Sequence, residues 1–207
     1  MRRFLLISGL AAMLAASPLL ANEKGPNREN RVGNGGPSVS GNLGATPTFD
    51  RRFGVVFDGS CSAFSQDSSN DGTAFDTYFV YSPSGQNMQA EVILGTLSDS
   101  LLFAYCTPFN PASPTTNLYA GDDDGGVGLG SAFVLADGIT MVPNQVYTLV
   151  VTSFSQGDSG TYTLQLGGDL QFGEPIEAVP VPTSGHRGLV LLGALLLLSG
   201  LVLVRRR

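Results

Sequence analysis

The sequence predicts an all-β domain, an antiparallel β-sandwich of about eight strands, and three observations support this fold class. First, residues 160–166 alternate strictly, with Tyr162, Leu164 and Leu166 on one face and polar side chains on the other, as in a half-buried strand. Second, residues 146–152 are mostly β-branched or aromatic, which is typical of a central strand. Third, no segment of the body keeps a helical period. We therefore place the β-sandwich domain at residues 49–167.

The expected strands follow one another along the chain, with clusters of turn-forming residues between them. They are residues 53–57, 75–81, 88–94, 101–106, 117–120, 131–135, 146–152 and 160–166. The sequence Gly-Asp-Ser-Gly at residues 157–160 consists of turn formers, so we expect a hairpin turn into the last strand there.

The N-terminus has the pattern of a secretory signal peptide at residues 1–21. Two arginines precede an apolar run over residues 4–16, and Pro18 and Ala21 follow it. A buried amphipathic helix is the alternative, but the run has no polar face. Residues 22–48 are rich in Gly, Asn, Pro and Ser and hold few large apolar side chains, so we expect a flexible arm there.

The C-terminus predicts a membrane anchor. Residues 188–204 form an apolar stretch that is about 25 Å long as a helix, slightly short for a bilayer core of about 30 Å. The three arginines at 205–207 act as a stop-transfer signal and mark the cytoplasmic side. Residues 168–187, which end in a proline-rich run, would form a semi-extended stalk.

The tail also has a more specific pattern than a plain anchor. It consists of Val181-Pro182-Thr183, a short polar gap, the leucine-rich span from Gly188 and the closing arginines. This arrangement resembles the bacterial IPTL-CTERM sorting signal, although Ser184 and Arg187 stand where leucine and tryptophan are usual. The resemblance implies recognition by an exosortase-type membrane transpeptidase and processing during sorting to the cell surface. A plain membrane anchor is the alternative.

Part of the body is similar to a second family. The similar segments are residues 76–80, 116–126, 130–133, 143–151 and 160–164. They resemble the bacterial pre-peptidase C-terminal (PPC) domain. That resemblance implies a jelly-roll-like β-sandwich that acts as an accessory or binding module of secreted enzymes.

Cys61 and Cys106 are the only cysteines. In an exported protein, a lone pair outside a CxxC motif most often forms a structural disulfide, which we expect here. A redox or nucleophilic thiol would need nearby cations to lower its pKa. No Lys or Arg lies between Phe53 and His186, so the sequence favours the disulfide.

The charge distribution excludes nucleic acid as a partner. Between Phe53 and His186 there are 14 acids, the 17 of the chain less Glu23, Glu29 and Asp50, and there is no base to neutralise phosphates. The segment 157–160 also resembles the nucleophile loop of trypsin-like proteases, but the sole histidine, His186, lies in the predicted stalk. We therefore expect no enzyme; a hydrolase with an all-carboxylate site is the alternative.

Asp122, Asp123 and Asp124, followed by two glycines, form the candidate metal site. Ca²⁺ takes six to eight oxygen ligands from carboxylates, carbonyls and water, and glycines allow backbone carbonyls to turn toward an ion. Asp122 and Asp124 are the preferred ligands because alternate side chains can converge. The spacing differs from that of an EF-hand loop. A solvated acidic turn is the alternative.

These observations together predict an exported, non-enzymatic binding or structural protein, with Ca²⁺ as a candidate cofactor. We expect it to be anchored in the inner membrane on the periplasmic side and then sorted to the cell surface. Its expected partners are the membrane, an exosortase-type enzyme and a surface polysaccharide or matrix ligand that the sequence does not identify. A secreted hydrolase, or an accessory module of a separate secreted enzyme, is the alternative function.

Overall fold

The computed structural model of the chain describes residue 32 and residues 35–51, 53–57, 59–62, 64–67 and 72–176. The chain divides into two compact units, Met1–Pro175 and Ile176–Arg207, and every described strand lies in the first. Apart from one 3₁₀ turn at Leu135–Asp137, the described residues form strands and loops only. The predicted all-β class is therefore confirmed.

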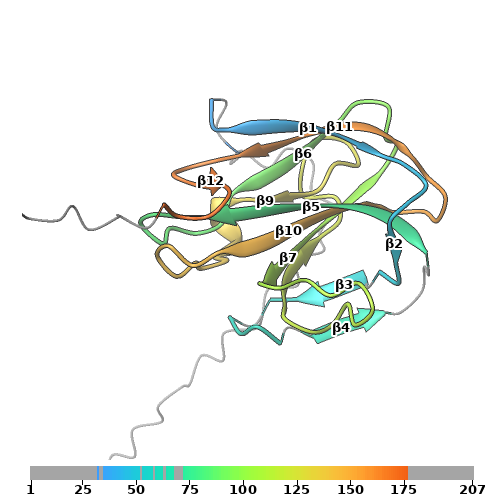
Figure 1. Cartoon of the computed structure of the whole chain (residues 1–207). Helices are drawn as coiled ribbons and strands as arrows, with labels where there is room; N and C mark the ends of the chain where they lie inside the picture. Colours follow the sequence, from blue (N-terminus) through green and yellow to red (C-terminus); the bar gives the residue numbers. More distant parts are fainter. Residues whose placement is uncertain are drawn as a thin grey trace, which may run out of the picture. The chain divides into compact units, whose positions relative to one another are not determined.

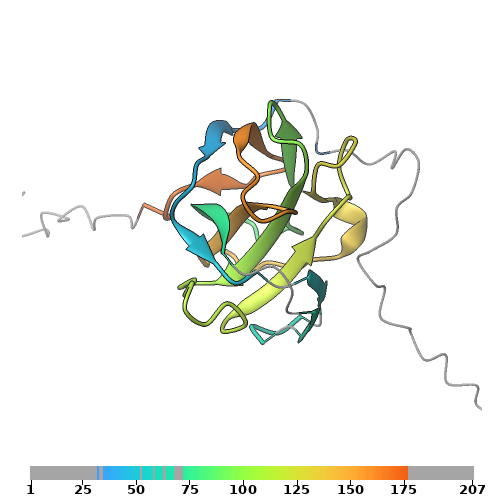
Figure 2. The ribbon, with the colours of Figure 1, turned by 90° about the vertical axis from the view of Figure 1, so that its right-hand side faces the viewer.

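Two antiparallel sheets face each other across the core of this unit (Figure 1). The four-stranded sheet has the order β1 (Ser38–Leu43), β11 (Gly160–Leu166), β6 (Ala90–Leu94) and β9 (Ala132–Phe133). The larger sheet has the order β12 (Gln171–Phe172), β5 (Thr73–Tyr81), β10 (Tyr147–Ser153), β7 (Ser100–Cys106) and β8 (Leu118–Asp122), and β2 (Thr48–Phe49) also pairs with β5. A separate pair, β3 (Phe53–Val56) and β4 (Phe64–Asp67), lies beside β8 (Figure 2).

The main core lies between the two sheets, and the alternation in β11 builds one side of it. Tyr162, Leu164 and Leu166 are buried there, as their spacing predicts, while Thr161, Thr163 and Gln165 are more exposed. They pack in one cluster with side chains of the larger sheet, including Val80, Leu102 and Leu149. The sandwich-like arrangement follows from this shared apolar layer.

Strands β7 and β10 are buried on both faces, which explains why their sequences are nearly continuous apolar runs. On the outer face of the larger sheet, Phe103 and Tyr105 belong to a second apolar cluster. Phe49 of β2 and Phe109 of the loop after β7 cover this cluster, and their rings meet edge to face with centroids 5.5 Å apart. The loop segments therefore act as a partial third layer.

All eight strands expected from the sequence are present, 160–166 with the expected ends and the others with shifted ends, and the described residues contain four more, β1, β2, β4 and β12. The boundaries of the domain were wrong on both sides. The expected flexible arm at 22–48 contains β1, which pairs with β11 from Ser38↔Gln165 to Leu43↔Gly160, and β2 begins at its last residue. The expected stalk at 168–187 contains the buried Leu170 and β12, which pairs with β5. The sandwich therefore extends beyond 49–167 in both directions.

The expected hairpin turn at residues 157–160 was also wrong. The segment leaves β10 in the larger sheet and enters β11 in the four-stranded sheet, so it crosses between the two layers. Asp158 accepts a hydrogen bond from the hydroxyl of Ser98, which fixes the crossing against the segment before β7. Alternating patterns identify strands but do not reveal which sheet each strand joins.

The expected signal peptide (1–21), sorting motif (Val181, Pro182, Thr183 and Gly188), membrane helix (188–204) and basic tail (205–207) lie outside the described residues. Within the part of the chain that the structure describes, no helix has the length and apolar character needed to span a bilayer.

Candidate metal site

The pairing of β7 with β8 brings three aspartates together at one end of the larger sheet. The register Leu102↔Asp122 places Asp99, just before β7, beside Asp123 and Asp124, just after β8. One carboxylate oxygen from each of these three residues lies within 4.8 Å of the other two. We call this group the acidic cluster. Asp99 was not among the residues chosen from the sequence.

Asp122 does not belong to the acidic cluster and has a different role. Its side chain is 6% exposed, and its Oδ2 accepts hydrogen bonds from the backbone N–H groups of Gly125 and Ala132, both at 2.8 Å. This ties the loop after β8 to the start of β9. A Cβ on Gly125 would lie 2.6 Å from the Ala132 oxygen and from Asp122 Oδ2, so only glycine fits there.

The charged form of the Asp123 carboxyl group is disfavoured in this site. Its pKa is raised from 3.8 to about 7, mainly by burial and then by the neighbouring charges of Asp124, Asp99 and Asp122 in that order, while Arg51 has a smaller opposite effect. The Oδ1 atoms of Asp123 and Asp124 have almost no solvent-accessible surface, and no hydrogen-bond donor among the described residues reaches them. Two carboxylate oxygens are therefore removed from water without a compensating hydrogen bond.

Arg51 is the one Lys or Arg side chain among the described residues, and it is 1% exposed. Its guanidinium donates a hydrogen bond to the backbone oxygen of Phe154 and lies over the Phe154 ring, 4.9 Å from the centroid. Phe154 in turn donates its N–H to the backbone oxygen of Asp99 at 3.3 Å. The effect of this one guanidinium on Asp123 is smaller than that of the three neighbouring carboxylates, which leaves the site negative.

The spacing of the acidic cluster fits a calcium ion. Ca²⁺ binds oxygen at about 2.3–2.6 Å, so two ligands on opposite sides of the ion are about 5 Å apart. The 4.8 Å limit on the cluster lies within that span. Asp99, Asp123 and Asp124 would supply three ligands, and backbone carbonyls and water would complete the shell.

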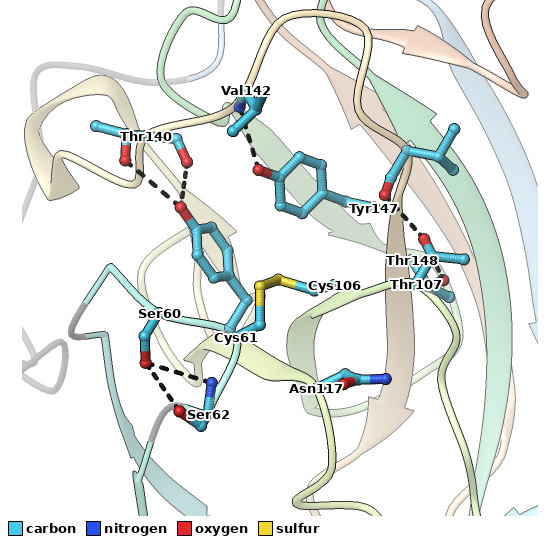
Figure 3. Close-up of a disulfide and its surroundings, with 12 residues drawn as sticks. Ser60, Cys61, Ser62, Cys106, Thr107, Asn117, Thr140, Val142, Tyr147 and Thr148 are labelled. Atoms are coloured by element: carbon cyan, nitrogen blue, oxygen red, sulfur yellow. Dashed lines mark hydrogen bonds between the residues drawn. A yellow bond between two sulfur atoms is a disulfide. The ribbon is translucent and has the colours of Figure 1, made fainter.

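The predicted disulfide between Cys61 and Cys106 is confirmed, with Cα atoms 5.6 Å apart (Figure 3). It joins the segment between β3 and β4 to the end of β7. Next to it, the rings of Phe57 and Tyr119 pack edge to face with centroids 5.1 Å apart, and Tyr119 donates a hydrogen bond to the Thr140 backbone oxygen at 2.5 Å. The disulfide therefore holds the β3–β4 pair against an aromatic part of the main core.

No family model, curated protein or solved structure matches the chain. The resemblances to the PPC domain and to the IPTL-CTERM signal therefore remain predictions that rest on their motifs.

Proposed function

We propose that the chain is an exported, non-enzymatic surface protein with a β-sandwich domain that binds Ca²⁺ at Asp99, Asp123 and Asp124. The observation that carries this proposal is the convergence of three partly buried carboxylates from two separate segments at 4.8 Å or less. Such an arrangement opposes folding through like-charge repulsion and loss of hydration. A bound cation reverses both effects, because it replaces the missing water and hydrogen bonds with metal–oxygen bonds.

The predicted location outside the cytoplasm is consistent with a weak site. Calcium sites in extracellular modules have dissociation constants of about 10⁻⁴–10⁻³ M and are filled by the calcium of their surroundings. Asp123 must lose its proton before it binds the ion, and its pKa of about 7 makes calcium affinity depend on pH near neutrality.

The geometry favours a cation site over the alternative of a carboxylate hydrolase. Glycosidases hold two carboxyl groups about 5–5.5 Å apart in retaining enzymes and about 6.5–9.5 Å apart in inverting ones, so that a sugar or a water fits between them. The oxygens of the acidic cluster are closer than that, and the inner oxygens of Asp123 and Asp124 are buried. A compact ion fits this space better than a sugar ring does.

Export and sorting are proposed from the two ends of the sequence. The support is the signal-peptide pattern of residues 1–21 and the tripartite tail at 181–207, and the jelly-roll-like, PPC-type assignment rests on the motif series in the body. The intact mass of the protein recovered from cells tests this part. Loss of residues 1–21 and of the tail segment is the expected result, and a mass that corresponds to the full chain would contradict it.

Thermal unfolding of the full chain in a mild non-ionic detergent tests the calcium site. At 10 mM Ca²⁺, about 100 times a dissociation constant of 0.1 mM, binding to the folded state alone adds about 2.7 kcal/mol, or about 5–10 °C in Tm. Mg²⁺ at equal concentration should give less because it dehydrates reluctantly.

Two variants make the test specific. Asp124→Asn should lose the excess effect of Ca²⁺ over Mg²⁺, whereas Glu174→Gln, which removes the same charge at an exposed position, should keep it. If Ca²⁺ and Mg²⁺ raise the Tm of the unmodified chain equally, the acidic cluster is a solvated acidic turn and not a calcium site.

A further inference from the structure

Among the described strands, β1 has a neighbour on one side only, β11, and so forms an open edge of the four-stranded sheet (Figure 1). Leu166 donates its backbone N–H to the Pro37 oxygen at 2.9 Å, which fixes the alternation of the ladder between β1 and β11. Val39, Gly41 and Leu43 are then the residues that exchange hydrogen bonds with β11. The backbone N–H and C=O groups of Ser38, Ser40 and Asn42 therefore point away from the sheet.

This edge lacks the features that usually prevent strand pairing. Residues 38–43 hold no proline and no charged side chain, and the pairing with β11 contains no bulge. The other edges of the two main sheets are protected: β9 and β12 are two residues long, and β3 lies beside β8. A six-residue open strand is a template for another strand.

The charge pattern makes a second copy of the chain a suitable partner. Residues 35–49 and 160–166 hold no charged side chain, although the body around them carries 14 acids and no base between Phe53 and His186. Two copies of such an acidic domain repel each other over most of their surface. They approach at least electrostatic cost along this uncharged edge.

The sequence of the strand is also self-complementary. In an antiparallel pair centred on Ser40, Ser40 faces Ser40 of the second copy, and Ser38 faces Asn42. All these side chains are exposed and able to hydrogen-bond across the pair. Val39 faces Gly41 of the second copy, and because glycine has no side chain there is room for the Val39 side chain. We propose that two copies of the chain associate through their β1 strands about a two-fold axis at Ser40, which joins two four-stranded sheets into one continuous sheet.

The interface is small, which determines how it must be measured. Two six-residue strands bury less than the roughly 1,000 Å² expected of a stable interface, so the dimer should be weak and depend on concentration. It should also strengthen with ionic strength, because screening reduces the repulsion between the acidic bodies.

Cysteine cross-linking of the full chain in detergent tests both the contact and its register. Residues opposite each other in a hydrogen-bonded antiparallel pair have Cα atoms about 5.5 Å apart, within the range for a disulfide. Ser40→Cys should give a disulfide-linked dimer on mild oxidation, in a yield that rises with protein concentration. Asn42→Cys alone should give at least tenfold less, and a mixture of Ser38→Cys and Asn42→Cys should restore the dimer. Equal yields for Ser40→Cys and Asn42→Cys, or no dimer from either, would overturn the proposal.

Amide hydrogen exchange distinguishes a second copy from other occupants of the same edge. If two copies pair, the amides of Ser38, Ser40 and Asn42 should gain protection as the protein concentration rises. Protection that is equal at all concentrations would mean that another segment of the same chain covers β1. Protection that appears only with a different added protein would identify a foreign strand, and either outcome rejects the proposal.

Discussion

Asp123 couples the stability of the fold to pH. Its pKa rises from 3.8 to about 7 on folding, chiefly because burial disfavours the charged form. Below about pH 4 both states are protonated; between pH 4 and 7 the folded state keeps a proton that the unfolded state has lost, so stability falls as pH rises. Above about pH 7 Asp123 is ionised in both the folded and the unfolded state, and the loss of folding stability has reached its full size.

Replacement of Asp123 by asparagine should remove this dependence. Without calcium, Asp123→Asn should melt at a higher temperature than the unmodified chain at pH 8 and at a similar temperature at pH 4. Melting curves at both pH values in a chelator measure the difference, with Glu174→Gln as the charge-matched control. If Tm falls equally from pH 4 to pH 8 in the unmodified chain and in Asp123→Asn, Asp123 ionises freely in the folded state and the prediction is wrong.

The acidic cluster was predictable in kind but not in membership. The run of aspartates after β8 marked a candidate cation site, yet Asp122 turns to the backbone and Asp99 takes its place beside Asp123 and Asp124. Asp99 lies more than twenty residues earlier, so spacing along the chain could not reveal it. If the strands at 101–106 and 117–120 had been paired as an antiparallel hairpin, Asp99 would have been placed beside Asp123 and Asp124.

At the level of secondary structure, strands with apolar or alternating sequences were predictable and polar or very short ones were not. β1 reads Ser-Val-Ser-Gly-Asn-Leu, and its composition is that of a loop. It forms a strand because tertiary contacts override propensity: Leu43 is buried, and the ring of Tyr162 covers Gly41, where a Cβ would lie 2.2 Å from that ring. β2 and β12 have two residues each, too few to show a period.

We expect the disulfide to stabilise the β3–β4 pair. The bond closes a separation of 45 residues, for which the chain-entropy model gives a stabilisation of about 4 kcal/mol. The double variant Cys61→Ser/Cys106→Ser should lose about that amount in urea unfolding, and reduction of the native protein should cause the same loss. Ser62→Ala, an exposed neighbour, is the control. A loss below about 1 kcal/mol would mean that the pair is held by packing alone.

On the scale of the whole domain, β7 separates the acidic cluster from the disulfide. Asp99 precedes its first residue and Cys106 is its last, so the acidic cluster and the disulfide lie at opposite ends of a seven-residue strand, about 23 Å apart. Sites that far apart contribute independently. Loss of the disulfide should therefore lower stability without a change in calcium affinity.

The charge of the domain also has a consequence for the whole molecule. With 14 acids and no base from Phe53 to His186, folding concentrates like charge, and added salt should raise Tm modestly in every variant. A specific ion site must produce an effect beyond this general screening.

Isothermal titration calorimetry of the full chain with Ca²⁺, at constant ionic strength and pH 8, tests the calcium site most directly. We predict one bound ion per chain with a dissociation constant of about 0.1–1 mM. We also predict at least tenfold weaker binding in Asp123→Asn and Asp124→Asn and unchanged binding in Glu174→Gln. No saturable binding to the unmodified chain, or equal binding in all four proteins, would contradict the assignment of Asp99, Asp123 and Asp124 as a calcium site.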